Sequence, residues 1–251
     1  MRAPRTQPAP SSVAIPNANK INWEIHRFGH PLRGYLKRLP LICAVAVLIF
    51  QARTAPLALI VLNADRLTVG KLPYDWQIKV THGRPEVSVC QDGGTPCIHL
   101  RSAKASFALE RTVDVDSAQL PYLAWRWKVT RLPSGGDFRR PSTDDQAAQV
   151  LVAFADHHIV SYIWDTSAPK GTFLSSSNFP LLHVYSLVCQ SGWSETNRWI
   201  AEYRNVADDY RLAYGKPAPP VRGLRIQINS QHTGTAAESY FGEVAFRSTP
   251  Q

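Results

Sequence analysis

Short alternations of apolar and polar residues, separated by clusters of Gly, Pro, Asp and Ser, dominate the chain beyond residue 65. Side chains alternate between the two faces of a β-strand, so a period of two is typical of strands buried on one face. Many short strands with turn signals between them predict a sandwich or a barrel. We expect strands at Asp75–Val80, Glu86–Cys90, Ile98–Ser102, Phe107–Val113, Tyr122–Val129, Gln149–Phe154, Ile159–Trp164, His183–Gln190, Trp199–Val206, Leu224–Ser230 and Ser239–Phe246.

One short helix is predicted over Ala207–Tyr214. Asp208 and Asp209 suit its first turn, because acidic side chains interact favourably with the positive end of the helix dipole. Gly215 is typical of the position after a helix, and Pro217 follows it.

The alternation also predicts which faces are buried. One strand carries an apolar row that consists of Leu123, Trp125, Trp127 and Val129. Polar residues occupy the opposite face of the same strand, and several other strands show the same split. The pattern therefore predicts an all-β, two-sheet antiparallel sandwich with one short helix, in which the apolar faces of the two sheets make the core.

The chain before residue 65 has a different pattern. Residues 1–32 are rich in Pro and Ser without periodicity, which predicts a disordered leader or a translation start that is placed too early. Within residues 33–62, a basic stretch precedes an apolar run that ends at Phe50, the order found in a secretory signal. A second apolar run, Leu57–Leu62, leaves an uncleaved membrane anchor as the alternative. We expect export to the periplasm or cell envelope, with the sandwich domain at residues 65–251.

The formal net charge of +9 is concentrated in the N-terminal part of the chain. Up to Pro56, eight basic residues accompany Glu24 as the single acidic residue. The remaining 20 basic and 18 acidic residues leave the predicted domain near +2. A near-neutral domain gives no electrostatic basis for binding a nucleic acid, and we expect membrane contact only through the N-terminal apolar segment.

Two cysteines flank a turn-forming sequence: Cys90 and Cys97 enclose QDGGTP. The strands on either side of this turn would bring the two sulfurs opposite each other, so the pair is either a disulfide or two buried free thiols. The cysteines and histidines do not have the spacing of a zinc site. We expect no cofactor.

Five segments resemble segments of a known family and occur in the same order as in that family. They are LPYLAWRWKV (Leu120–Val129), DDQAAQVLVAF (Asp144–Phe154), YIWDTSAPKGTF (Tyr162–Phe173), AEYRNVADDYRLAYG (Ala201–Gly215) and RIQINSQHTGTAAESYFGEVAF (Arg225–Phe246). In these segments the chain resembles an exported bacterial family known as domain of unknown function 3047, over about residues 67–247. The resemblance implies a jelly-roll sandwich similar to galactose-binding-like and carbohydrate-binding modules, and it brings no established activity.

The chain departs from the family pattern at two places. Family members often carry aspartates in the stretch that here reads Asn229 to Thr233, and paired acids where this chain has Gly242-Glu243. Such acids can hold a structural calcium through oxygen ligands, so their replacement weakens the expectation of calcium here.

Polar side chains opposite the apolar rows are the first candidates for a binding site. Planar amides, Arg and carboxylates beside an aromatic surface are suited to sugar-like ligands. A solvated outer sheet face with ion pairs between strands has the same pattern, so both interpretations stay open. The candidate ligand-binding residues are Arg126, Lys128, Gln149, Glu202, Arg204, Gln227 and Asn229, together with His232 and Glu238 near the last strand.

Three functions follow as hypotheses. The first is a non-catalytic envelope domain that binds a carbohydrate or another polar envelope polymer on the polar face. The second is a glycan-degrading hydrolase or lyase with Asp145, Glu202 or Glu238 as acid or base. The third is a protein-interaction module of a periplasmic assembly.

Overall fold

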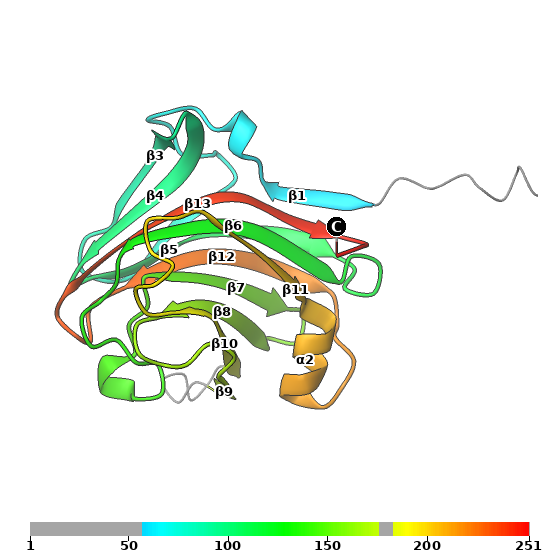
Figure 1. Cartoon of the computed structure of the whole chain (residues 1–251). Coiled ribbons are helices and arrows are strands. Elements are labelled where there is room, and N and C mark those ends of the chain that lie inside the picture. The colour runs from blue at the N-terminus through cyan, green and yellow to red at the C-terminus, as the bar shows by residue number, and fades with distance from the viewer. Residues whose placement is uncertain (1–56, 176–182, 251) are drawn as a thin grey trace, which may run out of the picture. The chain divides into compact units, whose positions relative to one another are not determined.

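Two β-sheets face each other across one apolar core (Figure 1). The computed structural model describes residues 57–175 and 183–250, which belong to one compact unit. The all-β sandwich predicted from the alternating pattern is confirmed. The predicted strands are all present, with ends that differ by a few residues.

The first sheet, which we call the six-stranded sheet after the strands described in it, contains the apolar row of Trp125 and Trp127. Its strands are antiparallel, and β1 pairs with β13 off the main path. In order, it consists of β11 (Ile200–Asn205), β6 (Tyr122–Arg131), β13 (Ala236–Arg247), β4 (Thr95–Ala103) and β3 (Glu86–Asp92), with β1 (Ala58–Leu62) beside β13.

The second sheet, the seven-stranded sheet, is antiparallel except for the parallel pair β8 and β10. In order, it consists of β2 (Gln77–His82), β5 (Ser106–Val115), β12 (Val221–Asn229), β7 (Ala148–Phe154), β8 (Ile159–Asp165), β10 (Val184–Ser191) and β9 (Phe173–Ser175).

Aromatic rings from both sheets meet in the centre of the core. The Trp125 ring stacks on Tyr162 of the opposite sheet with 5.1 Å between ring centroids, and Trp127 lies 6.0 Å from Trp164. All four side chains are almost completely buried. The period-two pattern of β6 therefore placed its tryptophans correctly in the core.

The predicted helix is present as α2 (Val206–Tyr214). The Asn205 side chain accepts hydrogen bonds from the backbone N–H groups of Ala207 and Asp208, which caps the first turn. Gly215 ends the helix with a φ of 68°, a conformation that glycine adopts without steric cost. Short 3-10 turns occur at Ala64–Arg66 and Pro141–Thr143.

The second apolar run of the leader belongs to the sandwich, which therefore begins upstream of the expected boundary at residue 65. Residues 58–62 form β1, whose Val61 and Leu62 are buried. The reason lies in the length of β13: its first half pairs with β4, and Val244–Arg247 would have a free edge without β1. The first apolar run, ending at Phe50, lies outside the described residues. Within residues 57–175 and 183–250, no helix is long and apolar enough to cross a membrane.

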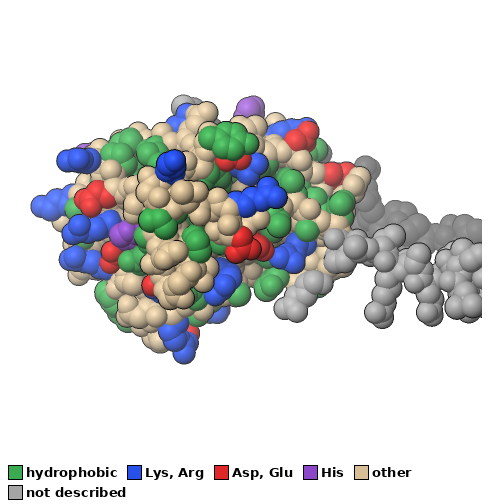
Figure 2. Space-filling model, turned by 90° about the horizontal axis from the view of Figure 1, so that it is seen from above, with side chains coloured by type: hydrophobic (Ala, Val, Ile, Leu, Met, Phe, Trp, Pro, Cys, Tyr) green, Lys and Arg blue, Asp and Glu red, His purple; other side chains and the backbone are tan. Residues whose placement is uncertain are grey.

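Charged side chains of both signs lie among one another on the face seen in Figure 2. Ion pairs among the described residues include Arg101 with Glu86 and Lys128 with Asp92. This mixture agrees with the near-neutral charge counted for the domain.

Candidate functional site

The candidate residues taken from the sequence do not form one polar face, and that prediction is wrong. The structure divides them among separate surfaces because β6 and β11 lie in one sheet whereas β7 and β12 lie in the other. Arg126, Lys128 and Glu238 lie on the outer side of the six-stranded sheet, Glu202 and Arg204 on its inner side, and Gln149, Gln227 and Asn229 on the outer side of the seven-stranded sheet.

Glu202 and Arg204 face inward because β11 pairs them with the buried Trp125 and Leu123 of β6. Glu202 accepts a hydrogen bond from Gln190 Nε2 at 2.6 Å. Burial disfavours its charged form and raises its pKa above the usual value, although Gln190 acts in the opposite direction. Arg204 donates to Asp209 on α2, so both residues belong to contacts inside the fold.

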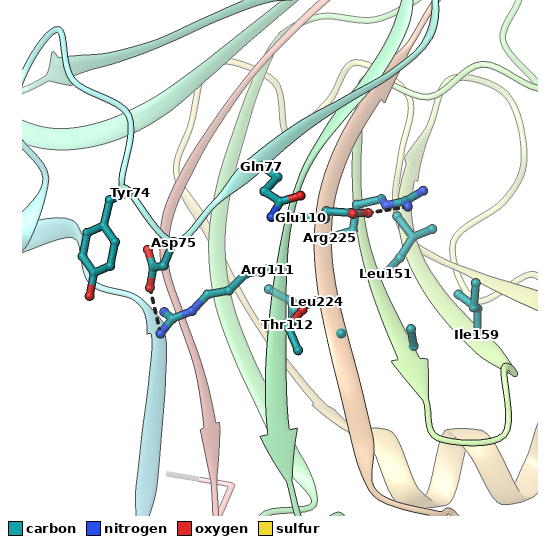
Figure 3. Close-up of a pocket in the computed structure, with 12 residues that line it drawn as sticks. Tyr74, Asp75, Gln77, Glu110, Arg111, Thr112, Leu151, Ile159, Leu224 and Arg225 are labelled. Carbon is teal, nitrogen blue, oxygen red and sulfur yellow. Dashed lines mark hydrogen bonds and ion pairs between the residues drawn. The ribbon is translucent and has the colours of Figure 1, made fainter.

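A groove extends over the outer face of the seven-stranded sheet. It consists of two adjoining hollows of about 580 and 310 Å³, which share Leu151, Ile159 and Arg225 in their linings. Residues of β2, β5, β12, β7, β8 and β10 line it, so the groove crosses six strands. Figure 3 shows the larger hollow.

Small residues make the floor of the larger hollow. Gly223 on β12 pairs with Thr112 on β5 and with Ala153 on β7, so three neighbouring strands carry short side chains at the same level. A Cβ at Gly223 would lie 3.5 Å from the Ala153 Cβ, an ordinary contact distance. The glycine therefore lowers the floor without being required by steric crowding.

A charged row crosses the groove beside this floor. Glu110 on β5 lies between Lys79 Nζ, at 3.3 Å, and Arg225 Nη2, at 2.6 Å (Figure 3 draws the Arg225 contact). Burial opposes ionisation of Glu110, but the hydrogen bonds and charges of Arg225 and Lys79 outweigh it and lower the pKa. The carboxylate is thus ionised at neutral pH and holds the Arg225 guanidinium in place.

Side-chain amides line the smaller hollow and form a chain of hydrogen bonds. Gln227 Nε2 lies 3.5 Å from Gln149 Oε1, and Gln149 Nε2 donates to Asn229 Oδ1 at 2.7 Å. Asn229 Oδ1 also accepts from the backbone N–H of Gln146, and its Nδ2 donates to the carbonyl of Asp144. Asn229 therefore holds the amides in position, while Gln227 is the member that presents its amide to the groove.

The rim of the smaller hollow is the loop that carries His232. The His232 backbone N–H donates to Asp145 Oδ1 at 3.2 Å, and the Thr233 N–H donates to Oδ2 at 2.6 Å. Asp145 is completely buried, so it fixes the rim loop and is not itself part of the groove surface. His232 is partly exposed and lines the hollow.

Several groove residues were not predicted from the sequence. Tyr74 at the rim of the larger hollow is 99% exposed, and Figure 3 shows its ring standing apart from the strands. Arg225 lies between the buried Leu224 and Ile226, so the sequence could predict that its side chain faces outward. The sequence could not predict its ion pair with Glu110. The other missed polar residues include Asp75, Gln77, Lys79, Glu110, Arg111, Ser161 and Ser186.

The three carboxylates proposed for catalysis lie in different parts of the fold. Asp145 is buried under the rim loop, Glu202 faces the interior, and Glu238 lies on the outer side of the six-stranded sheet. Glu238 accepts hydrogen bonds from Thr130 Oγ1 and from His99 Nε2, both at 2.8 Å. These residues do not come together as an acid and base across one cleft, as a glycan-cleaving pair requires.

No group of three or more His, Cys, Asp or Glu residues in the described part of the chain is arranged to hold a metal ion. Cys90 and Cys97 occupy directly opposite positions on β3 and β4, with their sulfurs 3.5 Å apart as free thiols. Burial, reinforced by Cys90, raises the pKa of Cys97 to about 12. A disulfide between them stays a prediction.

The two packed sheets define an all-β sandwich with a groove on one outer face. Residues 74–245 match the family described as Protein of unknown function (DUF3047). The chain belongs to this family, as its sequence segments had indicated. A comparison with curated proteins found no match.

Solved structures with a similar fold include two carbohydrate-binding modules from Clostridium thermocellum. The family 11 module of cellulase Lic26A-Cel5E is 6% identical, with a TM-score of 0.42 over 77% of this chain and 95% of that one. The family 30 module of Cel9D-Cel44B is 11% identical, with a TM-score of 0.42 over 75% and 96%. The xyloglucanase domain of NopAA from Sinorhizobium fredii is 10% identical, with a TM-score of 0.43 over 68% and 92%.

Proposed function

We propose that the groove of the seven-stranded sheet binds a carbohydrate chain and that the domain does not cleave it. The observation that carries this proposal is a groove of two adjoining hollows across six strands, over a floor of small residues. Amides and hydroxyls line it, together with two guanidiniums, Arg111 and Arg225, which are each paired with a carboxylate. Binding in such a groove places polar groups of the protein along the length of an extended polymer.

The chemistry of the lining is matched to sugar hydroxyls, which both donate and accept hydrogen bonds. Amides such as Gln77 and Gln227 offer a carbonyl acceptor and an N–H donor in the same plane, and Ser186 offers a hydroxyl. The charge of Arg225 is already balanced by Glu110. We therefore expect a neutral polysaccharide to be preferred over an acidic one.

The dimensions of the groove suit several sugar units. Six neighbouring strands are separated by five spacings of about 4.8 Å, so the groove extends about 24 Å across the sheet. Tyr74 lies at one rim, where its exposed ring offers a flat apolar surface for the C–H face of a sugar. His232 lies at the rim of the smaller hollow.

Affinity electrophoresis of the full-length chain through gels that contain neutral polysaccharides tests the proposal. We expect retardation by at least one glucan, xylan, mannan or galactan, without any shortening of the polymer. Gln227→Ala should weaken this binding about tenfold, which corresponds to about 1.4 kcal/mol for lost hydrogen bonding. Gln119→Ala, in an exposed turn outside the groove, is the matched control.

Two outcomes would contradict the proposal. Equal retardation of the Gln227→Ala variant and the unmodified chain would remove the groove as the binding surface. A shortened polymer would show cleavage and would overturn the non-catalytic part of the proposal.

We also assign the domain to the cell envelope. The basic stretch and apolar run of residues 33–50, which lie outside the described residues, support this location. Fractionation of cells that express the full-length chain should recover it in periplasmic or membrane fractions, and recovery in the cytosol would contradict the assignment.

A further inference from the structure

The other outer face of the sandwich, on the six-stranded sheet, carries a hollow of about 310 Å³. We call it the β11 hollow, because β11 forms one side of it. Its floor consists of small residues on three neighbouring strands: Ala201 on β11, Ala124 on β6 and Gly242 on β13. A Cβ at Gly242 would meet its nearest neighbour at 3.4 Å, so a small side chain would fit. The glycine thus leaves the floor open without steric necessity.

Two aromatic rings flank this floor. Trp199 and Tyr203 lie on the same side of the chain as Ala201, because residues two apart in a strand share a face. Four residues of extended chain separate the Cα atoms of these two residues by about 13 Å. The Trp199 indole N–H donates to Asp92 Oδ2 at 2.6 Å, which fixes the ring, while Tyr203 is 41% exposed.

The hollow also presents one free hydrogen-bond donor group and one free acceptor group. The Arg126 guanidinium lies 5.5 Å from the centroid of the Trp199 ring and forms no ion pair or hydrogen bond with another described residue. The Asp65 carboxylate at the rim likewise has no described partner. The remaining charges, Arg247 and Glu243, pair with each other at 2.9 Å. The hollow is therefore balanced in charge but not satisfied in hydrogen bonding.

We propose that the β11 hollow is a second saccharide site, which takes a neutral sugar unit. The C–H face of a sugar ring would pack on Tyr203, and its hydroxyls would accept from Arg126 and donate to Asp65. Asp65 offsets the attraction of the Arg126 guanidinium for an acidic sugar, so the hollow favours a neutral one. Because this site and the groove lie on opposite sheets, one molecule of the protein holds two glycan segments at once.

The test is NMR titration of the ¹⁵N-labelled full-length chain with neutral hexasaccharides of glucan, xylan, mannan and galactan type. The Trp199 indole N–H reports the β11 hollow and is assigned by its loss in Trp199→Phe. The Gln227 side-chain NH₂ reports the groove and is assigned with Gln227→Glu. We expect at least one oligosaccharide to shift the Trp199 signal with its own saturation curve.

Ala201→Leu fills the floor with an aliphatic side chain from an exposed position on the edge strand. We expect it to weaken the Trp199 response at least tenfold and to leave the Gln227 response unchanged. Ala118→Leu, in an exposed turn, is the matched control. Unchanged signals of the buried Trp164 indole show that each variant is folded. Arg126→Gln should weaken the response less than Arg126→Ala, because the amide keeps a donor.

The outcomes separate this proposal from the function proposed for the groove. A shift at Gln227 with none at Trp199 overturns the second site and leaves the groove intact. A shift at Trp199 that Ala201→Leu does not weaken overturns the assignment to the hollow. A response of Trp199 only to an acidic probe, oligogalacturonate, overturns the neutral ligand. Silence of both signals toward the whole panel overturns both proposals.

Discussion

The guanidinium of Arg204 hydrogen-bonds the carboxylate of Asp209, with Nε 2.9 Å from Oδ2, and so joins the edge strand β11 to the helix α2. Asp209 is almost completely buried and also accepts the hydroxyl hydrogen of Tyr162, which belongs to the opposite sheet, at 2.8 Å. The cluster connects both sheets and the helix. Its hydrogen bond holds Arg204 charged and raises its pKa.

Removal of Asp209 should therefore destabilise the fold strongly. Asp209→Ala leaves Arg204 and the Tyr162 hydroxyl without their partner in a buried setting, and we expect a loss of about 2–3 kcal/mol. This value is below that of a fully buried pair because Arg204 is partly exposed. Urea unfolding measures it. Asp114→Ala breaks the exposed ion pair with Arg222 and should change stability by less than about 0.5 kcal/mol; equal losses in the two variants would contradict the prediction.

Asn229 provides a second stability test, inside the groove. Asn229→Ala removes the acceptor of two N–H donors and the donor to the Asp144 carbonyl, so we expect a loss of about 2–3 kcal/mol. Gln227→Ala removes only one long hydrogen bond and should cost less than about 0.5 kcal/mol. Unfolding of both variants in guanidinium chloride measures these losses. A much larger loss for Asn229→Ala supports its role in positioning the other amides. Similar losses of stability in the two variants would show that Asn229 is a dispensable surface amide.

The pH dependence of stability should reveal that Glu202 lies in the interior. Its pKa is raised in the folded state by burial, so the folded protein binds a proton more tightly than the unfolded chain does. Stability is then highest below the unfolded pKa of Glu202 and declines as pH rises through its folded pKa. Glu202→Gln keeps an oxygen acceptor for Gln190, and we expect it to raise the free energy of unfolding at pH 7 and to flatten this decline.

Glu238→Gln is the matched variant, and we expect it to change the free energy of unfolding at pH 7 in the opposite direction. Burial opposes ionisation of Glu238, but Thr130 and His99 outweigh it and lower the pKa. Its contribution is present above the unfolded pKa and is lost as pH falls through the folded pKa. The variant should lower stability at pH 7 but not in acid, as followed by thermal unfolding from pH 3 to pH 8. A change in stability of the same sign in Glu202→Gln and Glu238→Gln at pH 7 would contradict the inner placement of Glu202 and the outer placement of Glu238.

Oxidation should join Cys90 and Cys97. Their sulfurs are 3.5 Å apart at opposite positions of β3 and β4, so a small movement reaches the bonding distance of about 2.05 Å. Closing a loop of this length stabilises a fold by about 2.5 kcal/mol in the chain-entropy treatment. Peptide mapping after mild oxidation should recover the Cys90–Cys97 linkage, and Cys97→Ser should abolish the gain in stability. Recovery of both thiols after oxidation would contradict the prediction.

Much of the fold was predictable from the sequence. Alternation in β6 placed Trp125 and Trp127 in the core, and Asp209 and Gly215 marked the two ends of α2. The order of strands was not predictable. In particular, the apolar residues of β1 had the composition of an exported leader, and only the free edge of β13 explains why they form a strand.

The sequence by itself determined which residues of each strand share a face, because that face depends only on the period of the extended backbone. It could not determine which faces are neighbours, because hydrogen bonding between strands far apart in the chain decides it. Glu202 and Arg126 looked equivalent in the pattern, yet the structure turns one inward and the other outward on adjacent strands. Only the tertiary structure brought Lys79, Glu110 and Arg225 together from three strands, since their ion pairs depend on the register of β2, β5 and β12.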